Sequence, residues 1–282
     1  MTGKPLDGKK LAEKISGALE PRVRALAKRI GRAPLLAIVA SPDEDASARS
    51  YRKVQEKACQ DVGLACRVVA ERWTGAAHVL RRLEELGPWD AAMINRPLPA
   101  AVSIEQLYDL LPPGRDAEGV TPASLGKLYS LKRFDDLRAK GLPAPCTALA
   151  VAELLRETGL PLAGKTAVVI GRSNTVGKPA AHLLSCLDLT VTLAHSKTAD
   201  LPGVVAAADV VVAAIGSAGA IKAAWIKPGA VVIDAGINAA GKKLVGDVEP
   251  AAAERAAFYT PVPGGVGPVT TAMLLSNAVA LA

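Results

Sequence analysis

The stretch "AVVIGRSNTVGKPAA" (residues 167–181) decides the fold class of this 282-residue chain. Its apolar run predicts a buried strand ending at Gly171, and a helix is expected to begin near Gly177 or Lys178. Glycines at such a turn let the backbone approach a pyrophosphate, and the helix N-terminus offers free N–H groups. The turn is one residue longer than the usual Gly-x-Gly-x-x-Gly pattern and carries Ser173 at its second position. It predicts a dinucleotide-binding site, against the plainer alternative of an ordinary strand–helix turn.

The end of the next expected strand, "LTVTLAH" (189–195), favours NADP over NAD. A chain that binds NAD usually carries an Asp or Glu there, which binds the ribose 2′-hydroxyl. This chain has His195 and Ser196 instead, followed by Lys197. Arg172 in the preceding turn adds a second positive charge. A cationic corner rich in hydrogen-bond donors suits a 2′-phosphate, and the alternative is a solvent-exposed basic corner.

The remaining sequence alternates between strand and helix patterns. The first half predicts a helix over 8–31, a strand over 34–40, and an amphipathic helix that ends at Gly63. The second half includes an expected strand "GAVVIDAGIN" (229–238), then a Pro- and Gly-rich loop and a final helix. Repeated βαβ units predict an α/β protein, and the length suits two domains.

Composition narrows the class of protein. No apolar run reaches the about 18 residues of a membrane-spanning helix, and the N-terminus lacks the apolar segment of a secretory signal. The four cysteines show no Cys-x-x-Cys spacing and the three histidines are scattered, so we expect reduced thiols in a cytoplasm and no metal site. The basic residues behind the net charge of +7 are spread along the chain with almost no aromatic residues between them, so they support nucleic acid binding only weakly and we expect no such partner. The charge fits a cleft for a polyanionic small molecule, or simply a basic surface.

Eight motifs follow one another in a recognisable order: "LDGKKLAEKI" (6–15), "SYRKVQEKAC" (50–59), "RPLP" (96–99), "RDAEG" (115–119), "PCT" (145–147), "VVIGRSNTVGKP" (168–179), "IKPGAVVIDAGIN" (226–238) and "TPVPGGVGPVTTAML" (260–274). In them the chain resembles the methylenetetrahydrofolate dehydrogenase/cyclohydrolase family over essentially its whole length. The resemblance implies two α/β domains with a cleft between them, a folate substrate in the cleft, and usually a homodimer. The folate domain would comprise residues 1–145 with the C-terminal helix 269–282. A Rossmann-like, doubly wound domain over 146–268 would bind NADP.

The resemblance also assigns residues to the site. Catalytic positions would be Tyr51, Gln55, Asn95 and Glu118. Substrate contacts would come from Tyr51, Leu98, Pro99, Glu118, Pro263, Gly264 and Gly265. Cofactor contacts would come from Thr147, Gly171, Arg172, Ser173, Gly177, His195, Ser196 and Ile237. A cis peptide bond is expected at Leu98–Pro99, at Val262–Pro263, or at both.

Three of these positions depart from the family pattern. Gln55 stands where the family has a lysine, Asn95 where it has a glutamine, and Glu118 where it has a pterin-binding aspartate. Residues four apart share a helix face, so Gln55 lies one turn beyond Tyr51, whereas Lys53 and Lys57 point elsewhere. An amide cannot cycle a proton near neutral pH.

We therefore expect an NADP-dependent methylenetetrahydrofolate dehydrogenase whose cyclohydrolase step is weak or absent. Hydride transfer depends mainly on positioning, whereas water addition to the methenyl product needs proton transfers. Two alternatives stay open. The altered pocket would suit a dehydrogenase that acts on another reduced pterin or an unrelated substrate, or the chain is a non-catalytic homologue that keeps its nucleotide site.

Overall fold

The computed structural model describes residues 3–241 and 243–282, and the chain forms two compact units. Unit 1 contains Met1–Glu13, Tyr129–Ala139 and Pro145–Met273. Unit 2 contains Lys14–Leu128, Lys140–Ala144 and Leu274–Ala282. Across the described residues, no helix combines the length and the apolar character needed to cross a membrane.

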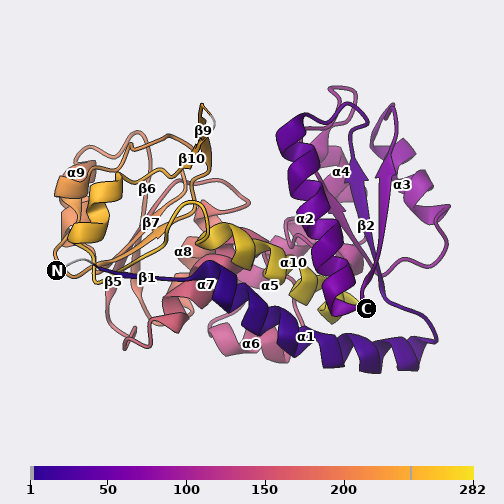
Figure 1. Cartoon of the computed structure of the whole chain (residues 1–282), viewed down its shortest axis with the longest axis horizontal. Coiled ribbons are helices and arrows are strands. Elements are labelled where there is room, and N and C mark those ends of the chain that lie inside the picture. The colour runs from indigo at the N-terminus through magenta and orange to yellow at the C-terminus, as the bar shows by residue number, and fades with distance from the viewer. Residues whose placement is uncertain (1–2, 242) are drawn as a thin grey trace. The chain divides into compact units, whose positions relative to one another are not determined.

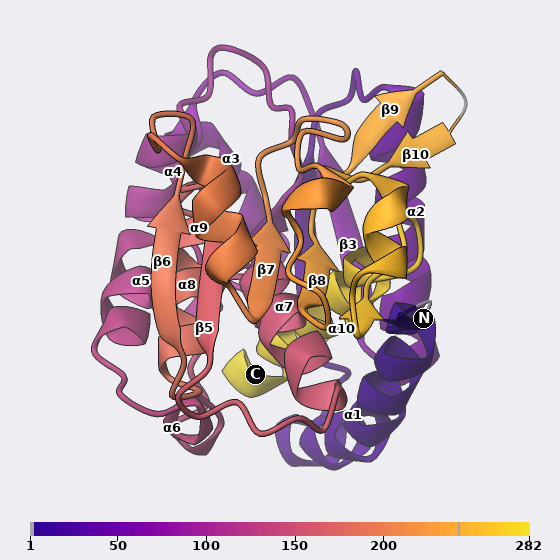
Figure 2. The ribbon, with the colours of Figure 1, turned by 90° about the vertical axis from the view of Figure 1, so that its left-hand side faces the viewer.

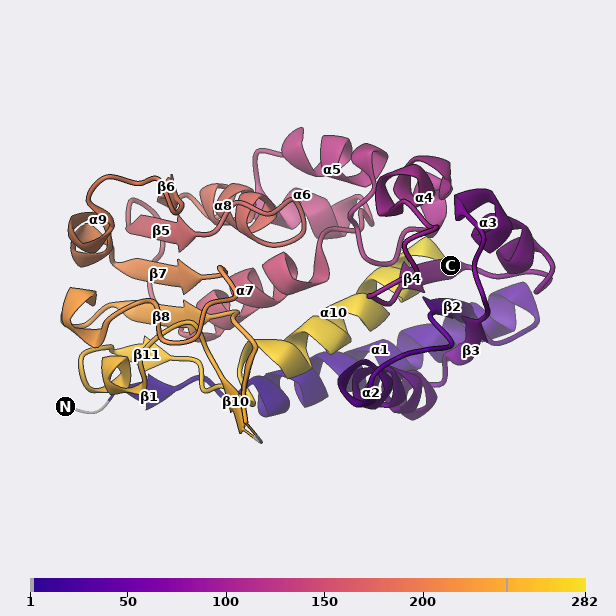
Figure 3. The same cartoon turned by 90° about the horizontal axis from the view of Figure 1, so that it is seen from above.

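Unit 1 is built on a six-stranded sheet in the order β1-β11-β8-β7-β5-β6, with every neighbouring pair parallel. The strands are β1 (Lys4–Pro5), β5 (Thr166–Ile170), β6 (Thr190–Ala194), β7 (Val210–Ala213), β8 (Val231–Asp234) and β11 (Phe258–Tyr259). Figure 3 shows them side by side. From β5 the chain continues to β6 on one side and returns to β7 on the other. This is the expected doubly wound parallel sheet, and its switch point lies between β5 and β7.

The helices of unit 1 are α6 (Phe134–Ala139), α7 (Cys146–Glu157), α8 (Gly177–Ser185) and α9 (Leu201–Ala207), with short 3₁₀ turns η2 (Ala223–Trp225) and η3 (Pro250–Glu254). Three of these helices, α7, α8 and α9, pack against this sheet, and α6 adjoins the end of α8, where the Phe134 N–H donates to the Cys186 carbonyl at 3.1 Å; Figure 2 shows all four. The strand expected over 229–238 is wrong in its second half, because β8 ends at Asp234. The Asp234 carboxylate accepts the Gly236 N–H at 2.9 Å and turns the chain. The following residues form a hairpin of β9 (Asn238–Ala240) and β10 (Lys243–Val245).

Unit 2 contains a three-stranded parallel sheet in the order β3-β2-β4. The strands are β2 (Leu35–Ala40), β3 (Ala65–Ala70) and β4 (Ala91–Ile94). The helices are α2 (Ala46–Val62), α3 (Ala76–Glu84), α4 (Ile104–Leu110) and α5 (Pro122–Tyr129), with the 3₁₀ turn η1 (Pro113–Arg115); α1 (Gly8–Ile30) and α10 (Val266–Leu281) contribute residues to both units. Figure 1 shows α2 on one side of this sheet and α3 on the other. An α/β protein with parallel sheets is therefore confirmed.

The sheet of unit 2 places the candidate site at its carboxyl edge. Asn95 follows β4, and its N–H donates to the Val39 carbonyl on β2 at 2.8 Å. The segment 115–119 runs beside the same edge, because the Ala117 N–H donates to the Ala92 carbonyl at 3.0 Å. Asn277 on α10 fixes this segment by donating from Nδ2 to the carbonyls of Ala117 and Ala144, both at 2.9 Å.

Candidate active site

Helix α2 carries the first two candidate residues. Its N-terminus is capped by Asp45, whose Oδ1 accepts the Ala48 N–H at 2.7 Å, and it ends at Gly63 with a positive φ of 83°. Capping at both ends fixes which residues of α2 face the sheet. Gln55 is completely buried, whereas the Tyr51 side chain is 43 % exposed. Tyr51 can therefore present its ring to a ligand while Gln55 lies beneath it.

Neither nearby lysine supplies an amine at the position of Gln55. Lys53 is exposed. Lys57 is also exposed, and its Nζ binds the Asp61 carboxylate at 2.9 and 3.0 Å. The helix register thus leaves an uncharged amide at the buried position of α2.

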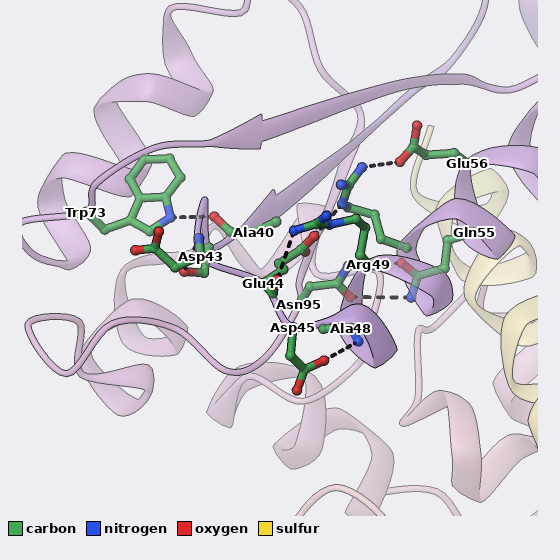
Figure 4. A network of polar contacts seen from close by, with 12 residues as sticks. Ala40, Asp43, Glu44, Asp45, Ala48, Arg49, Gln55, Glu56, Trp73 and Asn95 are labelled. Atoms are coloured by element: carbon green, nitrogen blue, oxygen red, sulfur yellow. Dashed lines mark hydrogen bonds and ion pairs between the residues drawn. The ribbon is translucent and has the colours of Figure 1, made fainter. Parts of the chain in front are cut away.

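Gln55 pairs with Asn95 across the carboxyl edge of the sheet. Asn95 Nδ2 donates to Gln55 Oε1 at 3.1 Å, and Gln55 Nε2 donates to Asn95 Oδ1 at 3.4 Å. Figure 4 shows the two amides facing each other. Asn95 is only 7 % exposed. The pair is thus a reciprocal, buried hydrogen bond between two groups that do not titrate near neutral pH.

Glu118 lies at the same edge, where the Ile94 N–H donates to its Oε2 at 2.8 Å. Burial raises the pKa of Glu118 to about 7, and the charge of Asp116 adds to this rise. The Ile94 N–H and the charge of Arg96 act in the opposite direction. A carboxyl group with such a pKa can change its protonation state at neutral pH.

Asp116 shapes the turn that presents Glu118. It is 1 % exposed, and its two oxygens accept the N–H groups of Gly119 and Thr121, both at 2.8 Å. Gly119 has a positive φ of 67°, and a Cβ there would lie 2.4 Å from the backbone of Ala144. Only glycine fits this position, so the turn holds the Glu118 backbone in one place.

The segment after Asn95 contains the residues expected at the substrate. Arg96 Nη2 donates to the Tyr108 hydroxyl at 2.9 Å. A cis peptide bond was expected at Leu98–Pro99, at Val262–Pro263, or at both, and it is confirmed at Val262–Pro263. The Leu98–Pro99 bond is not cis, and the cis bond of this segment is instead Arg96–Pro97. Leu98 and Pro99 are half-buried.

Glu44 is a buried carboxylate that sequence analysis did not single out. It is 7 % exposed, and its Oε2 accepts from Arg52 Nε at 2.9 Å. Its Oε1 is buried and has no hydrogen-bond partner among the described residues. Figure 4 draws Glu44 with the Gln55–Asn95 pair. Three acidic residues in "SPDED" (41–45) were the available signal, but nothing in that pattern says which of them is buried.

The nucleotide residues of unit 1 gather at the carboxyl end of β5. A Cβ on Gly171 would lie 2.1 Å from the Ala214 carbonyl oxygen, and one on Gly177 would lie 1.9 Å from the Gly171 carbonyl oxygen. Both glycines are therefore required by close backbone approach. Ser173 Oγ accepts the N–H groups of Val176 at 3.1 Å and Gly177 at 3.3 Å, which shapes the turn into α8.

The corner expected to read the cofactor phosphate lies beside this turn. The Gly171 N–H donates to the Ala194 carbonyl at 2.9 Å, so the end of β6 adjoins the glycine turn. Arg172 and Ser196 are both exposed at this edge. His195 is half-buried, and its Nδ1 accepts the Lys197 N–H at 3.1 Å. The arrangement leaves the Arg172 guanidinium and the Ser196 hydroxyl available to an anion.

The other predicted residues of unit 1 lie on separate elements. Thr147 is half-buried in the first turn of α7, and Ile237 is 62 % exposed between β8 and β9. Pro263, Gly264 and Gly265 precede α10, and Gly264 has a φ of 105°. Tyr51, Gln55, Asn95 and Glu118 all belong to unit 2. The residues predicted to contact the substrate are therefore divided between the two units, whereas all those predicted for the cofactor lie in unit 1.

Comparisons with known proteins match two parts of the chain to one family. Residues 6–118 match the family model described as tetrahydrofolate dehydrogenase/cyclohydrolase, catalytic domain, and residues 145–282 match its NAD(P)-binding domain. The chain is 45 % identical over 282 residues to the bifunctional protein FolD of Geotalea daltonii, covering 97 % of this chain and 96 % of that protein.

Solved structures give the same result. The methylenetetrahydrofolate dehydrogenase-cyclohydrolase of Trypanosoma brucei, complexed with NADP and an inhibitor, is 34 % identical with a TM-score of 0.89, covering 100 % of this chain and 97 % of that one. The bifunctional enzyme FolD of Campylobacter jejuni is 33 % identical with a TM-score of 0.88, covering 98 % of this chain and 97 % of that one.

Proposed function

The chain belongs to the tetrahydrofolate dehydrogenase/cyclohydrolase family, and on that premise we propose that it oxidises 5,10-methylenetetrahydrofolate with NADP but hydrolyses the methenyl product slowly or not at all. The observation that carries this proposal is the buried amide pair of Gln55 and Asn95. It occupies the place where the family pattern has a lysine.

We expect the dehydrogenase step to be retained because it needs little acid–base catalysis. Hydride leaves the methylene carbon between N5 and N10 of the folate, and the nitrogen lone pairs stabilise the resulting cation. NADP, when bound, accepts that hydride at C4 of its nicotinamide ring. The protein has to hold the two reactants in line. Tyr51 offers an exposed ring for the pterin, and Glu118 offers a carboxyl group to its N–H donors.

The hydrolytic step is the one that loses its catalyst. Water addition to the methenyl carbon and opening of the ring both move protons, and a positioned acid or base commonly contributes about 10²–10⁴-fold. Gln55 and Asn95 cannot exchange protons near neutral pH. Glu118 is a titratable group at the same edge, bound to the N–H of Ile94 next to Asn95, so rapid hydrolysis would point to its carboxylate as a candidate replacement base.

NADP rather than NAD is the cofactor. The glycine turn at Gly171 and Gly177 admits a pyrophosphate, and the end of β6 has no acid that would repel a phosphate on the adjoining ribose. Arg172 and Ser196 would hold the 2′-phosphate by charge-assisted and neutral hydrogen bonds respectively. The residues present therefore fit this cofactor.

A second candidate function is oxidation of another reduced pterin. It is favoured by the departures at Gln55, Asn95 and Glu118, which together change the shape and charge of the pocket wall. We further propose that residues 1–145 with 269–282 hold the folate, that residues 146–268 hold NADP, and that the enzyme is a cytoplasmic homodimer.

One assay tests the main proposal against its alternatives. Purified protein is supplied with methylenetetrahydrofolate and either NADP or NAD, and reduced nicotinamide is followed by fluorescence. Methenyltetrahydrofolate is measured separately by its own absorbance without acidification, because acid would close any 10-formyl product back to the methenyl form. We expect equal amounts of the two products with NADP and much slower reduction of NAD. NADPH without accumulating methenyl product would contradict the hydrolytic deficit, and no reduction at all would favour another substrate or a non-catalytic protein.

A further inference from the structure

Asp247 is a buried carboxylate that accepts four hydrogen bonds from two segments of unit 1. It is 0 % exposed. The N–H groups of Ile215 and Gly216 donate to Oδ2 at 2.7 and 2.9 Å, and the Ser217 N–H donates to Oδ1 at 2.8 Å. Asn238 Nδ2 donates to Oδ1 at 2.9 Å. One side chain therefore fixes three consecutive peptide groups and the first residue of β9.

Asp247 is itself held in place by the end of β8. Its own N–H donates to Asp234 Oδ1 at 3.0 Å, and the Val248 N–H donates to Asp234 Oδ2 at 2.9 Å. The surroundings leave no spare room. A Cβ on Gly236 would lie 2.3 Å from Asp247 Oδ1, and one on Gly246 would lie 1.9 Å from Asp234 Oδ2. The Asp247 carboxylate thus has little freedom to move relative to β8.

The segment that Asp247 fixes adjoins the glycine turn. The Ala214 N–H donates to the Ile170 carbonyl at 2.8 Å, and the Ala214 carbonyl oxygen occupies the space that a side chain at Gly171 would need. Residues 214–217 therefore leave β7 at the switch point of the sheet, where doubly wound folds bind a dinucleotide across the two halves. The adenosine half belongs over β6, beside Arg172 and Ser196. The nicotinamide half then belongs over β7 and β8.

We propose that Asp247 is a positioning residue for hydride transfer, which sets the surface under the nicotinamide half of NADP by fixing residues 215–217 and Asn238. Ile215 and Ile237 are 37 % and 62 % exposed on these two segments, so they can meet an apolar ring. Peptide groups are planar and trans, so carbonyls 214–216 point away from Asp247. The inference rests on NADP as the cofactor.

The test measures how Asp247→Asn changes kcat, the binding of NADP, and the binding of its adenosine half alone. This variant keeps the size of the side chain but loses the charge and one acceptor atom. We expect kcat to fall about 10–100-fold, because a misplaced nicotinamide ring is no longer aligned with the methylene carbon of the substrate. NADP should bind more weakly, while 2′,5′-ADP, which lacks the nicotinamide, should bind as in the unmodified protein. With substrate deuterated at the methylene carbon, the isotope effect on kcat should increase.

Two further variants keep the test decisive. Asn238→Ala removes one donor to Asp247 and leaves the backbone contacts, so it should show the same split to a smaller degree even if Asp247→Asn fails to fold. Asp209→Asn is the matched control, because Asp209 binds Lys227 and Thr166 at the opposite end of β7. It should lower Tm without changing kcat. The proposal is overturned if both nucleotides weaken equally, or if kcat and the isotope effect stay unchanged in a folded Asp247→Asn or Asn238→Ala protein. A different result would count against NADP as the cofactor. In that case the unmodified protein, with Arg172 and the glycine turn intact, would neither reduce NADP nor bind 2′,5′-ADP.

Discussion

Replacing Gln55 by lysine should raise the rate at which this protein hydrolyses methenyltetrahydrofolate. The lysine Nζ lies one bond further along its side chain than Gln55 Nε2, which is 3.4 Å from Asn95 Oδ1. The amine can therefore reach past the Asn95 amide toward the edge where Glu118 lies. General acid–base catalysis commonly contributes about 10²–10⁴-fold, and Asn95 is shorter than the family's glutamine. We therefore expect a gain of about 10²-fold, at the lower end of that range.

Gln55→Lys should also lower the stability of the folded protein. Asn95 Nδ2 loses its acceptor at 3.1 Å, and a buried donor without a partner costs about 1–3 kcal/mol. For a chain of this size that lowers Tm by about 2–4 °C per kcal/mol. Burial also lowers the pKa of an amine, so the new activity should rise with pH as the neutral base forms.

The assay is the hydrolysis of added methenyltetrahydrofolate, followed by its absorbance. Gln55→Met is the matched control, because its unbranched side chain reaches as far as the last carbon of lysine, cannot titrate, and also removes the acceptor of Asn95 Nδ2. It should lose stability without gaining activity. Gln55→Lys combined with Asn95→Gln should gain more than the single variant. A folded double variant that hydrolyses no faster than buffer would refute the assignment of the deficit to Gln55.

Three further predictions concern the choice of cofactor, the Glu118 carboxyl group and the glycine turn. Arg172→Ala should weaken NADP by about 1.5–3 kcal/mol and leave NAD nearly unchanged, measured as KM for each; equal losses would show that this corner does not read the phosphate. Glu118 binds a proton more tightly in the folded state, with a pKa of about 7 against 4.5, so the free energy of unfolding should decrease as pH rises between those values. Denaturant titrations should show that Glu118→Gln removes this slope, and an unchanged slope would place the titration elsewhere. Gly177→Ala should lower Tm and abolish NADP binding, because its Cβ would lie 1.9 Å from a carbonyl oxygen. Normal NADP affinity in Gly177→Ala would contradict this close approach. Gly17→Ala is the control, because a Cβ at this position of α1 meets nothing within 4 Å, and it should stabilise the protein by about 0.5–1 kcal/mol.

Local features of the fold and of the site were predictable from sequence because they depend on short-range rules. The helix containing Tyr51 and its end at Gly63 follow from amphipathic spacing and a glycine cap, and α2 has both. The glycine turn could be placed because an apolar run, a loop and a helix follow in order. The strand expected past Asp234 was wrong, because a side chain there bonds to the backbone and ends the ladder.

The contacts that join distant residues could not be predicted in the same way. The amides of Gln55 and Asn95 are forty residues apart and meet only because β2 and β4 are neighbours in the sheet. Strand β1 has two residues and pairs with β11, near the other end of the chain, so no periodicity marks it. Asp247 gathers donors from two segments that leave different strands. Such contacts follow from topology, which a single sequence specifies only indirectly.

The rate at which the unmodified protein hydrolyses methenyltetrahydrofolate decides whether the Gln55–Asn95 pair leaves the hydrolytic step without a catalyst. The measurement compares that rate with the buffer rate at equal pH, using a preparation whose NADP-dependent dehydrogenase activity has been established. A buried amide pair in place of a titratable amine predicts hydrolysis barely above buffer while dehydrogenation proceeds. Hydrolysis about 10²-fold or more above buffer would contradict the account, because it would show an acid–base group at work where Gln55 and Asn95 supply none.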